Sequence, residues 1–264
     1  KNINRPALGA YAMNGSISVD GSTVTVSTGN PNLDPYTSEE FDLSAEWYFG
    51  SVGMLTAGVF HKNIDGLVSS QTTTNVTYAS TGLAEGLYPG VTGSTIVASY
   101  TRQVNNNSAK LTGLELSAQS DFFFLPGVLK HMGAVANLTL IDSSTTNLVN
   151  GKPQKTDIFG LSDVNANATL YYETAKYGGR VSANYRSDYL IDSGAFNATT
   201  YVDAAAFYQL TPSIRLSLDA INLTNEREEQ VNSFNNGFGQ TGAKRLWNYT
   251  TSGRTVFIGA NIQF

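Results

Sequence analysis

This 264-residue chain lacks several features, and each absence excludes a class of protein or site. It has no cysteine, which excludes a disulfide framework and any thiolate metal site. No segment approaches the roughly 18 consecutive apolar residues that a membrane-spanning helix needs. Charged residues make up only 14%, against about 25% in average soluble domains. The net charge of −5 argues against nucleic acid, which requires a basic surface.

The N-terminus also lacks a recognisable export signal. Residues 1–5 contain two basic side chains, but no apolar stretch of the kind found in signal peptides follows them. We therefore expect a chain that is either mature or missing its N-terminal part.

Alternation of apolar and polar side chains is the dominant pattern, and it is clearest at the C-terminus. One face of residues 254–264 carries Val256, Ile258, Ala260, Ile262 and Phe264. The other face carries Thr255, Phe257, Gly259, Asn261 and Gln263. About eleven residues is the length that a tilted strand needs to cross a bilayer. The pattern predicts a strand with lipid on one face and water on the other.

Ten segments fit this pattern, and the connections between them alternate in length. The predicted strands lie near 1–12, 37–49, 53–69, 108–124, 129–142, 161–174, 179–190, 199–210, 213–225 and 252–264. Four connections are tight and contain Gly or Pro: 50–52, 125–128, 175–178 and 211–212. Five are longer: 13–36, 70–107, 143–160, 191–198 and 226–251. Strict alternation is typical of barrels with short periplasmic turns and long extracellular loops. The sequence predicts an all-β, antiparallel transmembrane β-barrel.

Aromatic residues gather at the strand ends that this arrangement places on the periplasmic side. They are Trp47, Tyr48, Phe49, Phe122, Phe123, Phe124 and Phe264. An aromatic girdle is expected at that interface, although aromatic residues also favour strands in general.

Five motifs in order along the chain carry a family resemblance. The first is GNPNLDPYTS at 29–38, followed by FDLSAEWYF at 41–49. The others are GVFHKNIDGLV at 58–68, LTGLEL at 111–116, AINLTNE at 220–226 and the ending at 253–264. Together they resemble the barrel of TonB-dependent outer-membrane receptors, and the final Phe264 resembles the barrel-assembly signal. The resemblance implies that residues 1–264 are the C-terminal part of a 22-stranded barrel. The plug domain, TonB box and N-terminal strands would lie outside this chain.

The resemblance also implies a function: active uptake of a scarce or bulky nutrient across the outer membrane of a Gram-negative bacterium. The wording NRPAL at 4–8 and EWYF at 46–49 is similar to a Xanthomonas/Caulobacter-type branch, which favours oligosaccharides; a ferric siderophore is the alternative. Implied partners are outer-membrane lipid and lipopolysaccharide, the TonB complex through the plug, and the barrel-assembly machinery through the last strand. No cofactor or resident metal is expected.

Candidate ligand contacts are the aromatic and basic side chains of the two longest connections. They are Tyr78, Tyr88, Tyr100, Arg102, Arg227, Arg245, Trp247 and Tyr249. Aromatic rings stack on sugars, and arginines attract anionic chelates. Each aromatic residue could equally pack within its loop.

Enzymatic constellations are poor, so we predict that the protein is not an enzyme. His61 and His131 are the only histidines, and no G-x-S-x-G nucleophile elbow occurs. The acidic run at 226–229 could chelate a cation but is more typical of a solvated loop. A small complete barrel, either porin-like or a barrel hydrolase, remains an alternative because ten strands is an even number.

Overall fold

The computed structural model describes residues 2–12, 16–50, 52–149, 152–191, 194–233 and 244–263. The chain divides into two compact units. Unit 1 comprises residues 1–40, 62–110 and 144–156, and unit 2 comprises 41–61, 111–143 and 157–264. Among the described residues, no helix is both long and apolar enough to cross a membrane.

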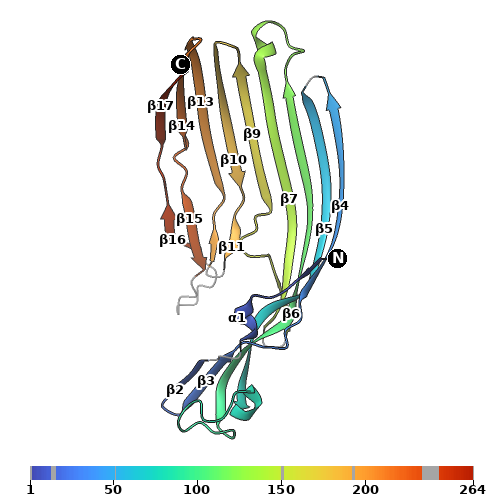
Figure 1. Cartoon of the computed structure of the whole chain (residues 1–264), viewed down its shortest axis with the longest axis vertical. Coiled ribbons are helices and arrows are strands. Elements are labelled where there is room, and N and C mark those ends of the chain that lie inside the picture. The colour runs from blue at the N-terminus through green and yellow to red at the C-terminus, as the bar shows by residue number, and fades with distance from the viewer. Residues whose placement is uncertain are drawn as a thin grey trace. The chain divides into compact units, whose positions relative to one another are not determined.

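A single layer of strands forms most of unit 2 (Figure 1). These strands are β4 (Tyr36–Phe49), β5 (Gly53–Thr77), β6 (Ile96–Asp121), β7 (Met132–Val149), β9 (Val164–Glu173), β10 (Tyr177–Arg186), β13 (Thr199–Thr211), β14 (Ile214–Ile221) and β17 (Thr255–Ile262). They are hydrogen-bonded in that order, and every pairing from β7 to β17 is antiparallel. Within the described part of the chain β17 pairs with β14 alone, so the sheet does not close. A complete ten-stranded barrel is therefore not what this chain forms.

The registers give this wall one apolar and one polar face, as the alternation predicted. Directly opposed residues share a face, and the row Ala136, Ala168, Ala183 and Val202 belongs to the apolar face. The neighbouring row Asn137, Asn167 and Asn184 belongs to the polar face. On the apolar face Ile258 leaves 85% of its surface exposed. A sheet face with so much exposed apolar surface requires a non-aqueous surrounding.

The short connections lie at one end of this wall, where β17 also ends (Figure 1). We call this the short-turn end and the other the long-connection end. The connections after β4, β9 and β13 are tight, as predicted. The one after β6 is longer, because residues predicted as the start of a strand at 129 form a 3-10 helix, η2 (Gly127–His131). Gly127 there adopts a positive φ of 65°.

Aromatic side chains cluster at the short-turn end. The rings of Trp47 and Phe49 lie 5.2 Å apart, and those of Phe123 and Phe124 lie 5.8 Å apart. Trp47, Phe123 and Phe124 are all largely exposed. This arrangement matches the predicted girdle, apart from Phe264, which lies outside the described residues.

Unit 1 has its own apolar core. It contains β1 (Asn2–Asn4), α1 (Leu8–Tyr11), β2 (Ser16–Asp20), β3 (Thr23–Thr28), η1 (Tyr78–Thr81), β8 (Lys152–Thr156) and parts of the long strands. β3 pairs in parallel with β6. The core consists of Val24, Val26, Tyr78, Val91, Val97 and Tyr100.

Unit 1 corrects several predictions. The strand expected at 1–12 is only β1 followed by one helical turn, because Pro6 has no N–H to continue a ladder. The connections expected at 13–36, 70–107 and 143–160 are largely strand. They were missed because residues such as 69–77 are rich in Thr, which suits strands, and in Ser, and neither gives apolar alternation.

A second sheet contains four short strands of unit 2. They are β11 (Tyr189–Ile191), β12 (Gly194–Phe196), β15 (Glu228–Ser233) and β16 (Lys244–Thr250), paired in that order. The connections predicted at 191–198 and 226–251 therefore contain two hairpin-like pairs.

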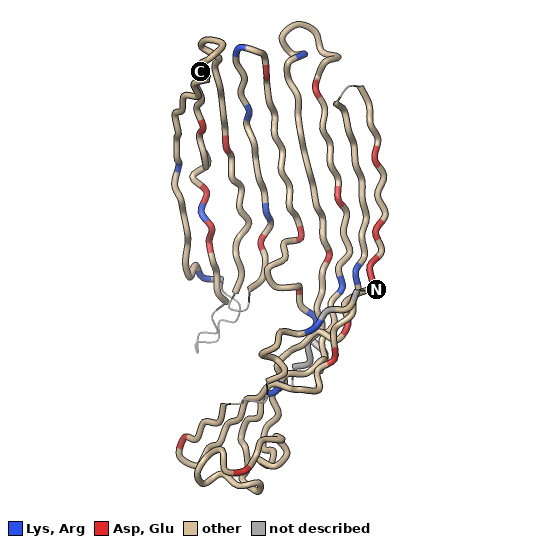
Figure 2. Tube along the Cα trace, in the orientation of Figure 1, with Lys and Arg blue, Asp and Glu red and all other residues tan. Residues whose placement is uncertain are grey.

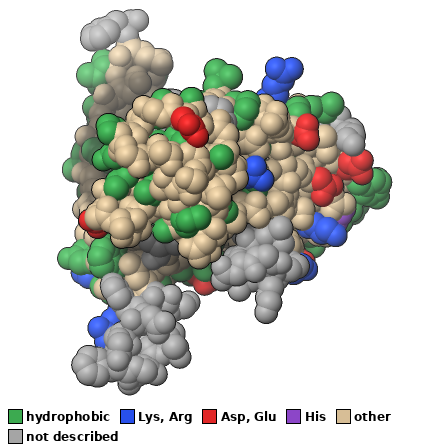
Figure 3. All heavy atoms as spheres, turned by 90° about the horizontal axis from the view of Figure 1, so that it is seen from below, with side chains coloured by type: hydrophobic (Ala, Val, Ile, Leu, Met, Phe, Trp, Pro, Cys, Tyr) green, Lys and Arg blue, Asp and Glu red, His purple; other side chains and the backbone are tan. Residues whose placement is uncertain are grey.

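Charged residues are sparse along the described trace (Figure 2) and on the face seen in Figure 3.

Candidate functional site

The polar face of the wall carries a hollow of about 810 Å³ between β6 and β14. Its lining includes Asp121, Tyr171, Arg180, Arg215 and Asp219. The hydroxyl of Tyr171 donates a hydrogen bond to Asp121. The guanidinium of Arg215 lies 3.6 Å from the centre of the Phe207 ring. Both signs of charge are thus presented on a face that alternation assigns to water.

Glycines let aromatic rings lie flat against this polar face. A Cβ added at Gly133 would collide with the ring of Tyr171, its directly opposed partner on β9. A Cβ added at Gly113 would collide in the same way with Phe60. The glycine in the LTGLEL motif therefore makes room for a ring from the neighbouring strand.

A buried asparagine fixes the corner where β14 leaves the wall. Asn222 has no exposed surface and a positive φ of 56°. Its side-chain oxygen accepts a hydrogen bond from the amide of Glu226 at 2.7 Å, and its Nδ2 donates to the Glu226 carbonyl at 3.1 Å. The NLTN motif thus sets the path of the chain into β15.

Of the predicted ligand contacts on this second sheet, the structure brings two together. The guanidinium of Arg227 lies 5.3 Å from the ring centre of Tyr249. A bulge opposite Gln230 and Val231 leaves Trp247 without a directly opposed residue. Because of that bulge, Arg245 lies on the other face of the sheet from Tyr249. Trp247 and Tyr249 expose 61% and 51% of their surfaces.

The sequence did not indicate a row of side chains that runs from the end of β10 across the second sheet, which we call the ladder. The guanidinium of Arg186 lies 3.8 Å from the Tyr189 ring centre, and Tyr189 stacks on Phe196 at 5.2 Å. Phe196 is directly opposed to Gln230, which is opposed to Asn248. Arg186 is held in place by hydrogen bonds to the Ser162 hydroxyl at 2.7 Å and the Gly160 carbonyl at 2.8 Å.

The four predicted contacts in unit 1 divide into core and surface. Tyr78 is fully buried and donates to the Ala84 carbonyl at 3.0 Å. Tyr100 is also buried and donates to the Thr81 carbonyl at 3.0 Å. These two rings stabilise the core and have no surface to offer a ligand, so we do not retain them as candidates. Tyr88 and Arg102 are exposed.

Aspartates gather at the long-connection end of β9. Asp163 is an exposed residue, but partial desolvation raises the pKa of its carboxyl, and the carboxylates of Asp157, Asp188 and Asp142 raise it further. Within the described ranges, no group of three or more His, Cys, Asp or Glu side chains is placed to hold a metal ion. This crowding therefore makes ionisation costly without forming a cation site.

Neither histidine lies in a catalytic arrangement. His61 Nδ1 is 2.8 Å from the Thr112 hydroxyl. The ring of His131 makes an edge contact with Tyr172 at 5.9 Å. Each histidine thus contacts a neighbouring strand, and no carboxylate orients either of them among these contacts.

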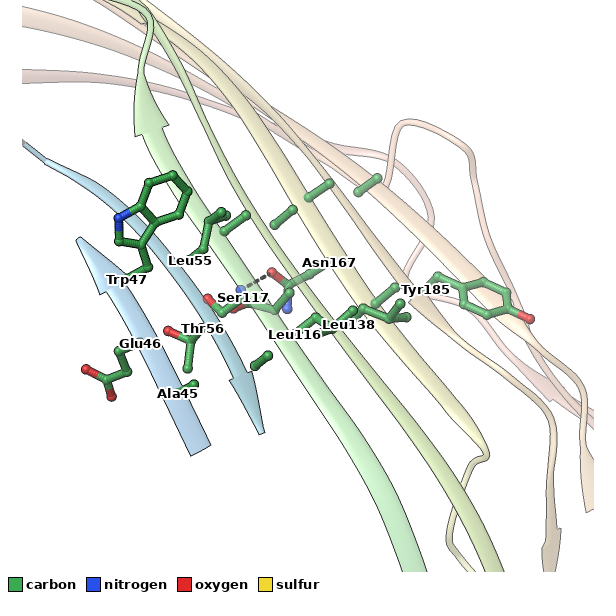
Figure 4. Close-up of a pocket in the computed structure, with 17 residues that line it drawn as sticks. Ala45, Glu46, Trp47, Leu55, Thr56, Leu116, Ser117, Leu138, Asn167 and Tyr185 are labelled. Carbon is green, nitrogen blue, oxygen red and sulfur yellow. Dashed lines mark hydrogen bonds between the residues drawn. The ribbon is translucent and has the colours of Figure 1, made fainter. Parts of the chain in front are cut away.

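The apolar face also carries a depression of about 810 Å³ (Figure 4). Its floor is made by alanines, among them Ala45, Ala118 and Ala168, and Trp47 and Tyr185 border it. Although Ser117, Asn137 and Asn167 are among its lining residues, the surface that it presents is almost wholly apolar, which suits a water-soluble nutrient poorly. We therefore assign the solute-facing role to the polar hollow and the second sheet.

Comparison with known proteins connects this geometry to one family. The family model described as "TonB dependent receptor-like, beta-barrel" matches residues 1–223. No curated protein sequence matches significantly.

Among solved structures, a mutant of the ferric enterobactin receptor of Pseudomonas aeruginosa superposes with a TM-score of 0.64 at 16% identity. The siderophore receptor PiuA of Acinetobacter baumannii gives 0.56 at 16% identity, and the ferric yersiniabactin uptake receptor of Yersinia pestis gives 0.55 at 17%. The alignments cover 99%, 94% and 95% of this chain but only 37%, 32% and 33% of those structures. The chain thus spans about a third of their length, and at this identity the likeness concerns the fold.

Proposed function

Because this chain belongs to the TonB-dependent receptor family of Gram-negative outer-membrane β-barrels, we propose that it forms the wall and outer rim of a receptor for active nutrient uptake. The observation that carries the proposal is the strand register from β7 to β17, which gathers the apolar side chains on one face of the sheet and the polar side chains on the other. The apolar face would meet hydrocarbon and the polar face a water-filled lumen. The short-turn end is then periplasmic and the long-connection end extracellular.

The rim that we propose for ligand contact is the second sheet. One face of this sheet carries Tyr189, on which Arg186 from the end of β10 stacks, and the amides of Gln230 and Asn248. The opposite face carries Tyr249 with Arg227 over its ring. Tyrosine faces and amides suit the apolar faces and hydroxyls of an oligosaccharide, which is the ligand class favoured by the family branch that the sequence resembles. We extend this rim to the exposed Arg245 and Trp247, and propose Tyr88 and Arg102 as separate candidate contacts within unit 1.

A ferric siderophore is the second candidate ligand. Each face of the sheet carries one arginine–tyrosine pair, and either pair would complement an anionic, aromatic chelate. The structural relatives named above carry siderophore or iron-chelate names in their titles, and their likeness to this chain is one of fold. The side chains of the rim therefore suit both ligand classes, and a binding measurement distinguishes them.

The proposed energy source lies outside this chain. The outer membrane has no proton gradient of its own, so uptake would be driven by the TonB complex acting on a plug domain. The polar hollow, with Arg180, Arg215 and Asp219, would form part of the wall around that plug. Folding would use the barrel-assembly machinery and the C-terminal strand, including Phe264.

Binding and uptake by the intact receptor test the proposal. Calorimetric titration with a panel of oligosaccharides and ferric chelates should give one class that binds, and an uncoupler should stop uptake without stopping binding. Replacing Tyr189 or Arg227 with Ala should weaken binding about tenfold, since each removes one stacked or charged contact. Phe124→Ala, an exposed aromatic at the opposite end, is the matched control and should leave affinity unchanged. Uptake that continues in the uncoupled cell would rule out TonB-dependent transport.

A further inference from the structure

A second recess on the apolar face differs from the alanine-floored depression because cationic side chains lie beside it. It has a volume of about 340 Å³ and lies over β9, β10, β13 and β14. Gly179, Ala204, Ala206 and Ala220 contribute to its lining, together with Leu170, Val181 and Leu218. The opposed pair Gly179 and Ala206 places two small residues side by side. The next row on this face pairs Val181 with Ala204 and Ala204 with Ala220, so the small residues continue across β13 and β14. We call this stretch of the recess the channel.

Three tyrosines of the short-turn end lie beside this recess. Tyr172 contributes to its lining and stacks on Tyr177 at 5.8 Å. Tyr177 is directly opposed to Tyr208. On this face of the sheet, that pair is the next one from Gly179 and Ala206 toward the short-turn end. Tyrosines in this position mark the depth at which hydrocarbon gives way to headgroups.

Two basic side chains lie on the same side of the wall as these tyrosines. The ammonium of Lys176 is 5.6 Å from the ring centre of Tyr208, and His131 contacts Tyr172 edge-on. The turn that carries Lys176 is held because its carbonyl accepts a hydrogen bond from the Gln209 amide at 2.7 Å. The cation is thus kept above the apolar face and not over the lumen.

The short connections carry basic residues and no acidic ones. Residues 50–52, 122–131, 174–176 and 212–213 contain Lys130, His131 and Lys176 and no Asp or Glu. The acidic residues that flank two of these connections, Asp121 and Glu173, alternate onto the polar face. An anionic group beside Tyr172 and Tyr208 would therefore meet the Lys176 ammonium from these turns and no carboxylate from them. Arg180 also contributes to the lining of the recess.

We propose that this recess is a binding site for one phospholipid of the periplasmic leaflet. An acyl chain occupies the channel over Gly179 and Ala206, and the headgroup phosphate lies by Lys176 and His131. The occupant follows from continuity, because the face already meets hydrocarbon and an unfilled recess would lose dispersion contacts. The leaflet rests on the orientation proposed above: Lys176 lies at the short-turn end, which that orientation places on the periplasmic side, where the outer membrane presents phospholipid and not lipopolysaccharide.

Native mass spectrometry of the intact receptor tests this inference independently of transport. The receptor is reconstituted in nanodiscs of phosphatidylglycerol or phosphatidylcholine, released into detergent, and its retained lipids are counted. Lys176→Gln should lower retention of phosphatidylglycerol about fivefold, as expected for one basic residue near an anionic surface. Ala206→Phe fills the channel and should lower retention of both lipids.

Matched controls separate the site from general lipid contact. Lys155→Gln removes a lysine from β8 of unit 1, and Ala260→Phe enlarges another apolar-face alanine, on β17 outside the recess. Neither should change retention. Heat-modifiable migration confirms that each variant has a folded barrel, and Lys176→Gln alone decides the result if Ala206→Phe does not fold. Equal retention by wild type and Lys176→Gln, or a response of bound lipopolysaccharide in place of phospholipid, overturns the proposal.

Discussion

The carboxylate of Asp203 on β13 accepts a hydrogen bond from the backbone amide of Asn222, at a distance of 2.8 Å, where β14 leaves the wall. Arg254, just before β17, donates to the carbonyl of Leu223 at 2.9 Å in the same corner. The corner thus joins β13, β14 and the approach to β17. It carries the chain from the wall to the second sheet, so its order determines how the rim residues are presented.

Replacing Asn222 with Ala should destabilise this corner by about 2–3 kcal/mol. The substitution leaves the Glu226 amide and carbonyl without their partners, which costs about 1–3 kcal/mol for buried groups. It also places a β-carbon at a φ of 56° without the local hydrogen bonds that Asn makes there. Hydrogen exchange of peptides covering 219–233 should report faster opening.

Asn222→Gly provides the control for backbone strain. Glycine adopts a positive φ freely but also lacks the side-chain bonds. It should lie between wild type and Asn222→Ala. If Gly and Ala are equally destabilising, strain is irrelevant here and the hydrogen bonds account for the effect.

Charge placed on the apolar face should be costly. Ile258→Lys or Leu216→Arg should lower the free energy of unfolding by roughly 2–4 kcal/mol if the site lies near mid-bilayer. Asn261→Lys and Ser217→Arg, which point to the polar face, should cost far less. Urea unfolding in liposomes measures the difference. Equal costs for the two pairs would contradict the assignment of faces.

The aspartate cluster at the long-connection end should make stability depend on pH. Since the folded pKa of Asp163 is raised, ionising it opposes folding. This penalty is absent below the unfolded pKa of about 4, grows as pH rises through the folded pKa, and is complete above it. Asp163→Asn should therefore raise the melting temperature at pH 7 and have little effect at the most acidic pH. Asp20→Asn, on β2, is the control; a larger gain at low pH than at pH 7 would refute the sign.

Tyr78 should be essential to unit 1 and dispensable to the wall. Tyr78→Ala removes a fully buried ring, a loss of about 3–5 kcal/mol. Exchange should accelerate in peptides covering 16–28 and 96–102 but not in those covering 199–221. Tyr78→Phe loses only the bond to the Ala84 carbonyl, about 1 kcal/mol. If Tyr78→Ala instead abolishes ligand binding while unit 1 stays protected, its place in the core would not be its main role.

The wall could be predicted from sequence because bilayer and lumen select side chains residue by residue. Val256, Ile258 and Ala260 alternate in the sequence, and the structure pairs them with Ala220, Leu218 and Leu216 on the same face. The tight turns after β4 and β13 were visible as well, since they carry Gly50 and Pro212. The turn after β9 is residues 174–176, without Gly or Pro, because Gly178 lies in β10.

Other parts could not be predicted, because they depend on partners distant in sequence. Tyr78 and Val24 meet only when β3 pairs with β6, and no local pattern indicates that pairing. The ladder of Arg186, Tyr189 and Phe196 needs the register of β11 with β12. The separation of Arg245 from Tyr249 depends on a single bulge. Local alternation therefore yields the wall but not the site.

The glycine at position 133 has a consequence for the polar face of the wall. Because it has no side chain, the ring of Tyr171 can lie along the wall and give its hydroxyl to Asp121. Any larger residue at 133 would push that ring off the wall and leave the Asp121 carboxylate without this donor. The relief and the local charge of this face thus depend together on a residue that adds no side-chain atoms to it.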